Sequence, residues 1–235
     1  MYGRSAAYYD SIYTWKNYEK EAKKLQRFIE RYKRATGRAL LDVACGTGNH
    51  IKYLMKRYAV EGLDINPAML KQAREKYPEI TFHHGDMCSF ELGKRYDVIT
   101  CLFSAIGHVK TKTKLRQAVR QMARHLEAGG LLVLEPWITP ERWTIGHISA
   151  NFVNQPKLKL ARLSISKRRG RCSVNDEHHL VASPRGIEYF VERLELGLFT
   201  TIEYRNAIKE ARLDVRYDPK GLMGRGLYFG LKPLS

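Results

Sequence analysis

Three aspartates stand at or near the ends of successive apolar runs, where carboxylates could bind a polar ligand. Asp42 lies in "ALLDVA", Asp64 is near the end of "AVEGLDI" and Asp86 ends "ITFHHGD". The first run leads into a glycine turn, "CGTG", which contains Gly46 and Gly48. Glycine lets the backbone approach a ligand closely and adopt positive φ without steric cost. A carboxylate on the next strand can accept hydrogen bonds from both hydroxyls of a ribose. This arrangement predicts a binding site for a nucleoside.

The glycine turn does not have the order of a dinucleotide-binding turn. That order is GxGxxG, whereas the chain reads "DVACGTG", which indicates a different adenosine cofactor. The segment "GDM" puts Asp86 and Met87 just beyond the third apolar run. A carboxylate there suits an exocyclic adenine amine, and a methionine side chain suits the face of the ring. Both residues are therefore predicted to contact adenine.

A histidine closes the fourth apolar run, "VITCLFSAIGH". An imidazole with an ordinary pKa of about 6.5 can accept a proton from an amine near neutral pH, or hold the amine by a hydrogen bond. In the alternative interpretation, a histidine at this place caps the loop or contacts the cofactor and has no catalytic role. His108 is the candidate catalytic residue, and its role as a base or as an orienting group stays open.

Strands and helices alternate over the first part of the chain. Asn66 and Pro67 have the residue types expected at the N-cap and first position of one of the helices. Helices are predicted at 22–32, 49–57, 67–77 and 113–126, and strands within the apolar runs "ALLDVA", "AVEGLDI", "ITFHHGD", "YDVITCLF" and "LLVLEPW", the last after a turn at "EAGG". This order predicts an α/β, Rossmann-like fold with a mostly parallel seven-stranded sheet.

The pattern changes after Pro140. Two alternating segments, separated by the turn signal "KRRGR", precede the run "IEYFVERLELGLFT", which is rich in strand formers. They predict antiparallel strands inserted as a cap over the carboxyl edge of the sheet. The expected organisation is a single domain of residues 1–235, with N-terminal lid helices (1–34), a cofactor-binding core (35–140), an inserted β cap (141–199) and a closing helix and β-hairpin (200–235).

Composition restricts the class of protein. A chain of 235 residues, of which 44% are hydrophobic, suits one globular domain. Its apolar runs are too short to cross a membrane, and its N-terminus lacks a secretory pattern, so no membrane association and a cytoplasmic location are expected. The four cysteines have no zinc-ligand or disulfide spacing, and no metal is expected.

The net charge of +17 has more than one interpretation. Basic residues cluster at 15–34, 110–124 and 157–171. They could attract RNA or another polyanion, or steer a phosphorylated substrate. They could equally form a solvated basic surface of the kind found in thermophiles. Charge alone therefore selects no substrate.

Taken together, the glycine turn, Asp64 and "GDM" resemble the class I S-adenosylmethionine-dependent methyltransferases. The resemblance implies S-adenosyl-L-methionine as the cofactor and S-adenosyl-L-homocysteine as its product. It also implies the following cofactor-binding residues: Tyr18, Asp42, Ala44, Cys45, Gly46, Asp64, Ile65, Met69, Asp86, Met87, Leu102 and Phe103.

A narrower resemblance covers nearly the whole chain. The segments "YDSIYTWKNYEKEA", "LLDVACGTGNH", "HHGDM", "VITCLFSAIGH", "VLEPWITPERW" and "GRGLYFG" are similar, in this order, to the dTDP-amino-sugar N,N-dimethyltransferases of the desosamine and mycaminose type. The resemblance implies a dTDP-linked 3-amino-deoxyhexose that is methylated twice on nitrogen. It places His108 beside the amine, with Tyr2 closing on it. Arg225 would contact a substrate phosphate, and Ser104 and Trp137 are expected as further substrate contacts.

Two other functions stay open. Enzymes that methylate amines of nucleobases usually carry an Asn/Asp-Pro-Pro-aromatic run after the fourth strand, and "FSAIGH" lacks it. An RNA or protein methyltransferase that docks through the basic segments is nevertheless an alternative. The other alternative is a non-catalytic module that binds S-adenosylmethionine. The glycine turn, Asp64 and His108 together argue against it. The sequence leaves open the acceptor, the number of methyl groups, and the choice between monomer and homodimer.

Overall fold

A seven-stranded sheet forms the centre of the computed structural model, which describes residues 3–234. Its strand order is β10-β11-β5-β4-β1-β2-β3, and every neighbouring pair is parallel except the two that involve β11. The strands are β1 (Ala39–Val43), β2 (Ala59–Asp64), β3 (Thr81–His84), β4 (Tyr96–Cys101), β5 (Leu126–Leu134), β10 (Asp214–Asp218) and β11 (Leu227–Leu231). The predicted α/β fold with a mostly parallel sheet is confirmed.

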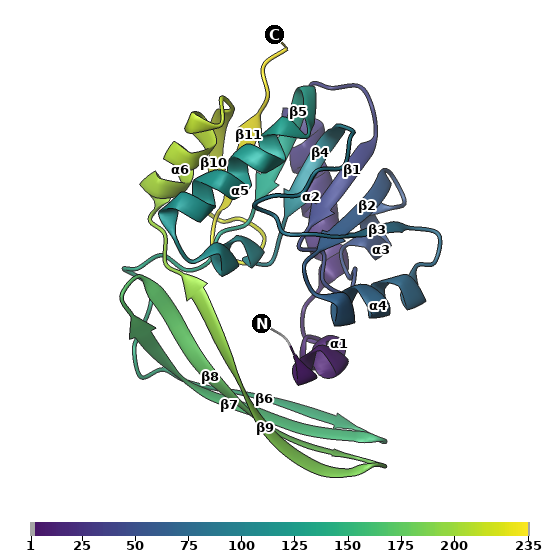
Figure 1. Ribbon diagram of the computed structural model, residues 1–235, viewed down its shortest axis with the longest axis vertical. Helices are drawn as coiled ribbons and strands as arrows, with labels where there is room; N and C mark the ends of the chain where they lie inside the picture. The colour runs from purple at the N-terminus through teal and green to yellow at the C-terminus, as the bar shows by residue number, and fades with distance from the viewer. Residues whose placement is uncertain (1–2, 235) are drawn as a thin grey trace.

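Helices cover both faces of this sheet because each presents an apolar stripe to it (Figure 1). On one face, buried residues of α5 (Lys112–Arg124) and α6 (Thr201–Glu210) pack against the core. On the other face lie α2 (Tyr18–Tyr32), α3 (Ile51–Leu54) and α4 (Pro67–Lys76). As predicted, Asn66 caps α4, and its side chain accepts hydrogen bonds from the backbone of Ala68 and Met69.

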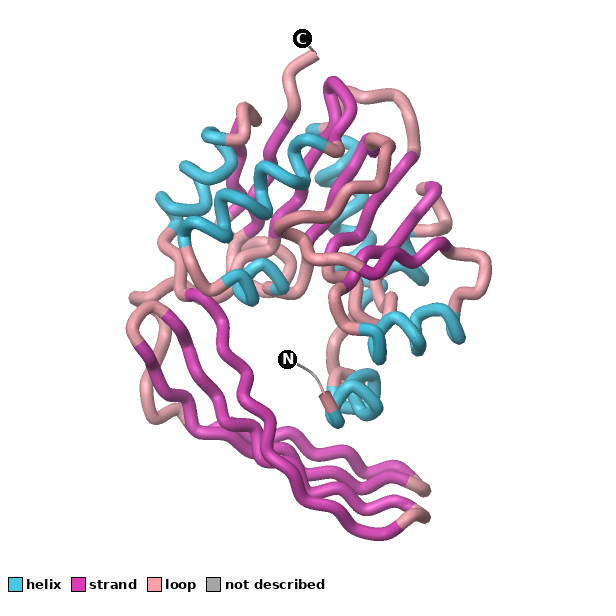
Figure 2. Tube along the Cα trace, viewed as in Figure 1, coloured by secondary structure: helices cyan, strands magenta, loops and turns pink. Residues whose placement is uncertain are grey.

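A second sheet of four antiparallel strands extends from the core as a single layer (Figures 1 and 2). Its strands, in order, are β6 (Ile148–Gln155), β7 (Leu158–Arg169), β8 (Cys172–Ser183) and β9 (Gly186–Gly197). The antiparallel cap is confirmed, although β6 was not recognised as a strand in the sequence. We call this sheet the cap. The N-terminal elements η1 (Arg4–Tyr8) and α1 (Tyr9–Ile12) lie between it and the core.

Two local predictions are wrong. The helix expected over 49–57 has a single turn, α3, because the chain returns to the sheet at Ala59. The expected turn at "EAGG" lies inside β5, where Gly129 has φ of 72° and the pairing with β4 is irregular. Glycine at this irregularity keeps the strand in the sheet although the sequence is typical of a turn.

No helix among residues 3–234 is long and apolar enough to cross a membrane.

Candidate active site

The glycine turn after β1 is the first part of the site. Ala44, Gly46 and Gly48 all have positive φ, of 58°, 56° and 80°. The carboxylate of Asp64, at the end of β2, accepts a hydrogen bond from the backbone nitrogen of Gly46 at 2.8 Å. Its other oxygen accepts one from the backbone nitrogen of Asn66, also at 2.8 Å. One carboxylate thus holds both the glycine turn and the start of α4 in place.

Two adjoining cavities lie at the carboxyl edge of the parallel strands. The larger, of about 260 Å³, is lined by these predicted cofactor residues: Ala44, Gly46, Asp64, Ile65, Met69, Asp86, Met87, Leu102 and Phe103. The smaller, of about 40 Å³, shares part of this lining and adds Tyr18, Asp42 and Cys45. The structure therefore brings the whole predicted cofactor set together around one continuous hollow.

The smaller cavity has an acidic, polar wall. Asp42 is 2% exposed, and burial raises the pKa of its carboxyl to about 6 although Thr100 donates a hydrogen bond to it at 2.7 Å. The hydroxyl of Tyr18 is buried, and none of the described residues hydrogen-bonds to it. A buried carboxylate and an unsatisfied hydroxyl fit the cationic, polar end of S-adenosyl-L-methionine.

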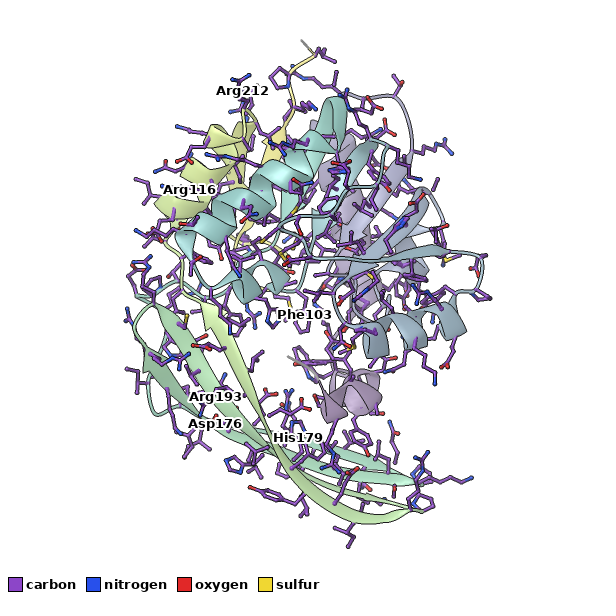
Figure 3. All side chains as sticks on the ribbon, viewed as in Figure 1. Phe103, Arg116, Asp176, His179, Arg193 and Arg212 are labelled. Atoms are coloured by element: carbon purple, nitrogen blue, oxygen red, sulfur yellow. The ribbon has the colours of Figure 1, made fainter. Side chains whose placement is uncertain are left out.

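The turn after β4 forms the opposite wall, and Figure 3 shows Phe103 in the space between the core and the cap. Phe103 and Ser104 have φ of 50° and 62°, a conformation that costs a residue other than glycine roughly 1–3 kcal/mol. Glu135 accepts a hydrogen bond from the backbone nitrogen of Phe103 at 2.6 Å. The hydroxyl of Ser104 donates to the carbonyl of Pro136 at 2.7 Å and accepts from Arg225 at 2.9 Å. These partners hold the turn in its strained form.

His108 lies just beyond this turn, in the 3-10 helix η2 (Ala105–Val109), and it lines the larger cavity. Burial, with a smaller contribution from the positive charge of Lys110, lowers the pKa of its imidazole to about 4. The ring is therefore neutral at physiological pH. A neutral imidazole of such low basicity can orient an amine by hydrogen bonding but is a weak proton acceptor.

A buried arginine borders the same turn. The guanidinium of Arg225 lies 4.6 Å from the ring centroid of Trp137, whose indole nitrogen donates to the hydroxyl of Ser173 at 2.9 Å. Lys16 is a second cation here, with Nζ 4.3 Å from the centroid of the Phe103 ring. Burial lowers the pKa of both Lys16 and Arg225. Because Lys16 is ion-paired with Glu21, Arg225 is the one of these two cations that offers positive charge beside the predicted acceptor site.

Known proteins match most of the chain. A family model described as a methyltransferase domain matches residues 40–130. A dTDP-3-amino-3,6-dideoxy-alpha-D-glucopyranose N,N-dimethyltransferase from Streptomyces fradiae is 39% identical over 233 residues, which is 97% of this chain and 91% of that protein. The chain belongs to the amino-sugar N,N-dimethyltransferases. It is an S-adenosylmethionine-dependent enzyme, as the sequence predicted.

Solved structures of amino-sugar methyltransferases have the same fold. DesVI from Streptomyces venezuelae is 36% identical, with a TM-score of 0.91 over 99% of this chain and 100% of that one. CalS10, an amino pentose methyltransferase from Micromonospora echinaspora with S-adenosylmethionine bound, is 37% identical, with a TM-score of 0.86 over 99% of this chain and 98% of that one.

Sequence reasoning missed two further residues that this amino-sugar methyltransferase places at the site. The ring of Tyr13 packs edge-on against Phe103 with centroids 5.1 Å apart. Its hydroxyl accepts a hydrogen bond from Arg162 of the cap at 3.2 Å. Tyr13 stands in the segment "YDSIYTWKNYEKEA" that carries the resemblance. The tyrosine predicted to close on the amine is Tyr2, which lies outside the described residues. An arginine among the apolar residues of a predicted cap strand was the available signal for Arg162.

Asp10 links helix α1 to the glycine turn of the enzyme. Its carboxylate accepts hydrogen bonds from the side chains of Thr47 at 2.6 Å and Asn49 at 2.9 Å, and from Lys76 of α4 at 2.7 Å. These three hydrogen bonds and the charge of Lys76 lower the pKa of Asp10 despite its partial burial. Helix α1 is therefore tied directly to the glycine turn.

Proposed function

We propose that this enzyme methylates the amino group of a dTDP-linked amino-deoxyhexose, and that it does so twice. The observation that carries the proposal is the similarity over 97% of the chain to the Streptomyces fradiae enzyme, whose name states that substrate class and dimethylation. The site agrees, because a neutral histidine suits an amine and the buried guanidinium of Arg225 suits a diphosphate.

The predicted cofactor residues divide between the two ends of the hollow. Asp64 is available to the ribose, and Asp86 and Met87 to the adenine, while Asp42 and Tyr18 face the smaller cavity. When bound, S-adenosyl-L-methionine supplies a methyl group on a sulfonium, which the lone pair of an amine displaces to leave S-adenosyl-L-homocysteine. The turns after β1 and β4, which carry Ala44 and Phe103, both line the larger cavity.

The role proposed for His108 is orientation. An amine reacts through its lone pair, and a well-aligned pair of reactants can gain roughly 7–11 kcal/mol from positioning alone. With its pKa lowered to about 4, the imidazole is a hydrogen-bond partner rather than an efficient base at neutral pH. The amine can lose its proton to solvent before it binds.

Arg225 is proposed to contact the diphosphate. Its guanidinium is held from behind by Ser104 and stacked on Trp137, which leaves a planar cation fixed in direction. Such a group is suited to bidentate contact with phosphate oxygens. Ser104, which was predicted as a direct substrate contact, is better proposed as the residue that positions Arg225, because it is 2% exposed and already bonded to protein.

The basic surface does not require an RNA substrate. Several basic residues of the cap form ion pairs with neighbouring carboxylates: Lys167 and Arg193 with Asp176, Arg169 with Glu195, and Arg171 with Glu203. Their charge is therefore partly neutralised where an RNA backbone would have to bind.

The cytoplasmic location stays a prediction.

The test is transfer of a labelled methyl group from S-adenosyl-L-methionine to a panel of dTDP-3-amino and dTDP-4-amino sugars, free amino sugars and bulk RNA. Label in a dTDP-amino sugar, with mono- and dimethylated products by mass spectrometry, is the expected result. Arg225→Lys should raise KM for the dTDP-sugar by about tenfold or more and leave the affinity for the methyl donor unchanged. Label in RNA alone, or equal activity on free sugars, would contradict the proposal.

A further inference from the structure

An arginine is buried in the face of the cap that packs on the N-terminal elements. Arg162 lies in β7 and its side chain is 11% exposed, whereas those of Lys167 and Arg169 on the same strand are 60% and 71% exposed. It shares a face with the buried residues Leu160 and Ser164, because alternate residues of a strand point to the same side. Removing a guanidinium from water is costly unless polar groups bond it. Arg162 therefore depends on its partners for its place in the cap.

Two of these partners belong to the cap itself. Asn151, directly opposite on β6, accepts a hydrogen bond from Nη2 of Arg162 at 2.6 Å. The carboxylate of Glu177 on β8, which is also buried, lies 3.5 Å from Nη1. The two strands that flank β7 therefore hold the guanidinium in one orientation.

A third partner belongs to the N-terminal segment. Nη1 of Arg162 donates to the hydroxyl of Tyr13 at 3.2 Å, and the guanidinium carbon lies 5.2 Å from the centroid of that ring. Tyr13 directly follows α1 and packs with Ile12 and Leu160 in a small apolar cluster. In such surroundings a hydrogen bond from a charged donor is stronger than in water. The cap therefore fixes the Tyr13 ring by a polar and an apolar contact.

Tyr13 in turn supports the strained turn after β4. Its ring meets that of Phe103 edge-on, with centroids 5.1 Å apart and an interplanar angle of 88°. Phe103 has φ of 50° and lines both cavities of the site. Figure 3 labels Phe103 at the edge of the core and His179, the residue of β8 that pairs with Arg162, on the cap. Three side chains in contact, Arg162, Tyr13 and Phe103, therefore connect the cap to the wall of the site.

We propose that Arg162 is a positioning residue for methyl transfer and that it acts through Tyr13. By fixing Tyr13 it keeps the Phe103 ring in place at the wall of the site, where a misplacement of about 1 Å can lower the rate by about 100-fold. Arg162 is not among the described residues that line either cavity, so its effect is indirect. This role rests on the proposed function, since it concerns the alignment of that acceptor with the methyl donor.

A double-mutant cycle with Arg162→Met and Tyr13→Phe tests the role. Methionine removes the charge but keeps a long side chain, and phenylalanine removes the hydroxyl but keeps the ring. We expect kcat to fall by about tenfold or more for Arg162→Met and by a smaller factor for Tyr13→Phe, with KM for donor and acceptor within about threefold of the parent values. The double variant should be no slower than Arg162→Met, because both changes remove the same contact.

Two further variants separate this role from a general effect on the cap. Arg193→Met is the matched control, because Arg193 is also an arginine of the cap paired with a carboxylate, that of Asp176, but its side chain is 59% exposed. It should keep kcat within about twofold of the parent value. Arg162→Lys keeps a charged donor and should recover part of the loss in kcat.

Three results would overturn the role of Arg162: an unchanged kcat in Arg162→Met, losses that multiply in the double variant, or a loss confined to KM. Circular dichroism and calorimetric binding of S-adenosyl-L-homocysteine report whether each variant is folded. If Arg162→Met does not fold, Arg162→Lys takes its place in the cycle with Tyr13→Phe. The cycle uses whichever acceptor the unaltered enzyme labels. An acceptor other than a dTDP-amino sugar would contradict the proposed function, while the comparison of variants would still test Arg162.

Discussion

The two turns that enclose the active site are built by different means. After β1, positive φ falls mainly on glycines, Gly46 and Gly48, and carboxylates support the turn: Asp64 its backbone, and Asp10 the side chains of Thr47 and Asn49. After β4, positive φ falls on Phe103 and Ser104, and the support comes from the end of β5 and from the loop before β11. The first turn has little conformational strain, whereas the second places its positive φ on residues other than glycine and is strained.

This difference suits the two ligands. The methyl donor is the same in every cycle, so a low-strain glycine turn is sufficient to bind it. The acceptor has to be aligned with the methyl carbon, and a turn held by several side chains at once can move only if all of them move. The following predictions test this contrast, from the largest expected effect to the smallest.

Asp64→Ala removes the carboxylate that accepts the backbone hydrogen bond of Gly46 in the glycine turn. Because the same carboxylate is proposed to bind the ribose, we expect the dissociation constant of S-adenosyl-L-methionine to rise by about 100-fold or more, measured by calorimetry. Asp214→Ala, at an exposed position on β10, is the control and should bind normally. Near-normal binding by Asp64→Ala would show that the glycine turn keeps its conformation, and binds the donor, without the Asp64 carboxylate.

Glu135→Ala leaves the backbone nitrogen of Phe103 without its acceptor. We expect a loss of about 1–3 kcal/mol in the free energy of unfolding, and a fall of roughly 10- to 100-fold in kcat/KM for the acceptor, with donor affinity unchanged. Glu135→Gln keeps an acceptor oxygen and should recover most of both. If the alanine variant matches the parent enzyme in stability and kinetics, Glu135 does not hold the turn that carries Phe103.

The affinity for the methyl donor should fall in acid because of Asp42. Burial raises its pKa to about 6, so the carboxyl gains a proton below that pH and loses its attraction for a cationic ligand. From pH 7 to 9 the dissociation constant should be flat, and between pH 6 and 5 it should rise by up to about tenfold. Asp42→Asn should bind the donor more weakly at pH 8 and show no such rise in the dissociation constant. A pH profile identical to that of the parent enzyme would show that Asp42 is not responsible for the loss of affinity in acid.

His108→Asn tests orientation against proton transfer. If the imidazole only positions the amine, the variant should keep kcat within about tenfold of the parent, because asparagine also hydrogen-bonds. The two pH–rate profiles should be parallel from pH 6 to 9, since a group with a pKa near 4 does not titrate there. A loss of about 10²–10⁴-fold in kcat would identify His108 as a base instead.

The smallest effects concern the backbone of the first turn. Gly46→Ala should cost about 1 kcal/mol of stability, because the added methyl meets no atom within 4 Å and only the positive φ opposes it. Ala44→Gly, at φ of 58°, should stabilise by up to about the same amount. Thermal denaturation measures both, and a much larger loss for Gly46→Ala would reveal a steric constraint in the turn.

The same contrast explains what the sequence could and could not predict. The fold and the residues that line the two cavities were accessible because glycines, strand-end carboxylates and apolar runs are local signals. The supports of the second turn were not, since nothing near Phe103 indicates that Glu135 accepts its backbone hydrogen bond. Tyr13 and Arg162 meet only after the cap has folded over the core, so each looks like an ordinary surface or strand residue in the sequence.

The bonds from Asp10 to the glycine turn concern the timing of the steps between the two methyl transfers rather than the transfers themselves. An enzyme that adds two methyl groups to one nitrogen has to discard a spent donor and admit a fresh one between the two transfers. Any movement of α1 away from the glycine turn during that exchange breaks the contacts of Asp10 with Thr47, Asn49 and Lys76. These contacts therefore oppose such a movement between the two transfers.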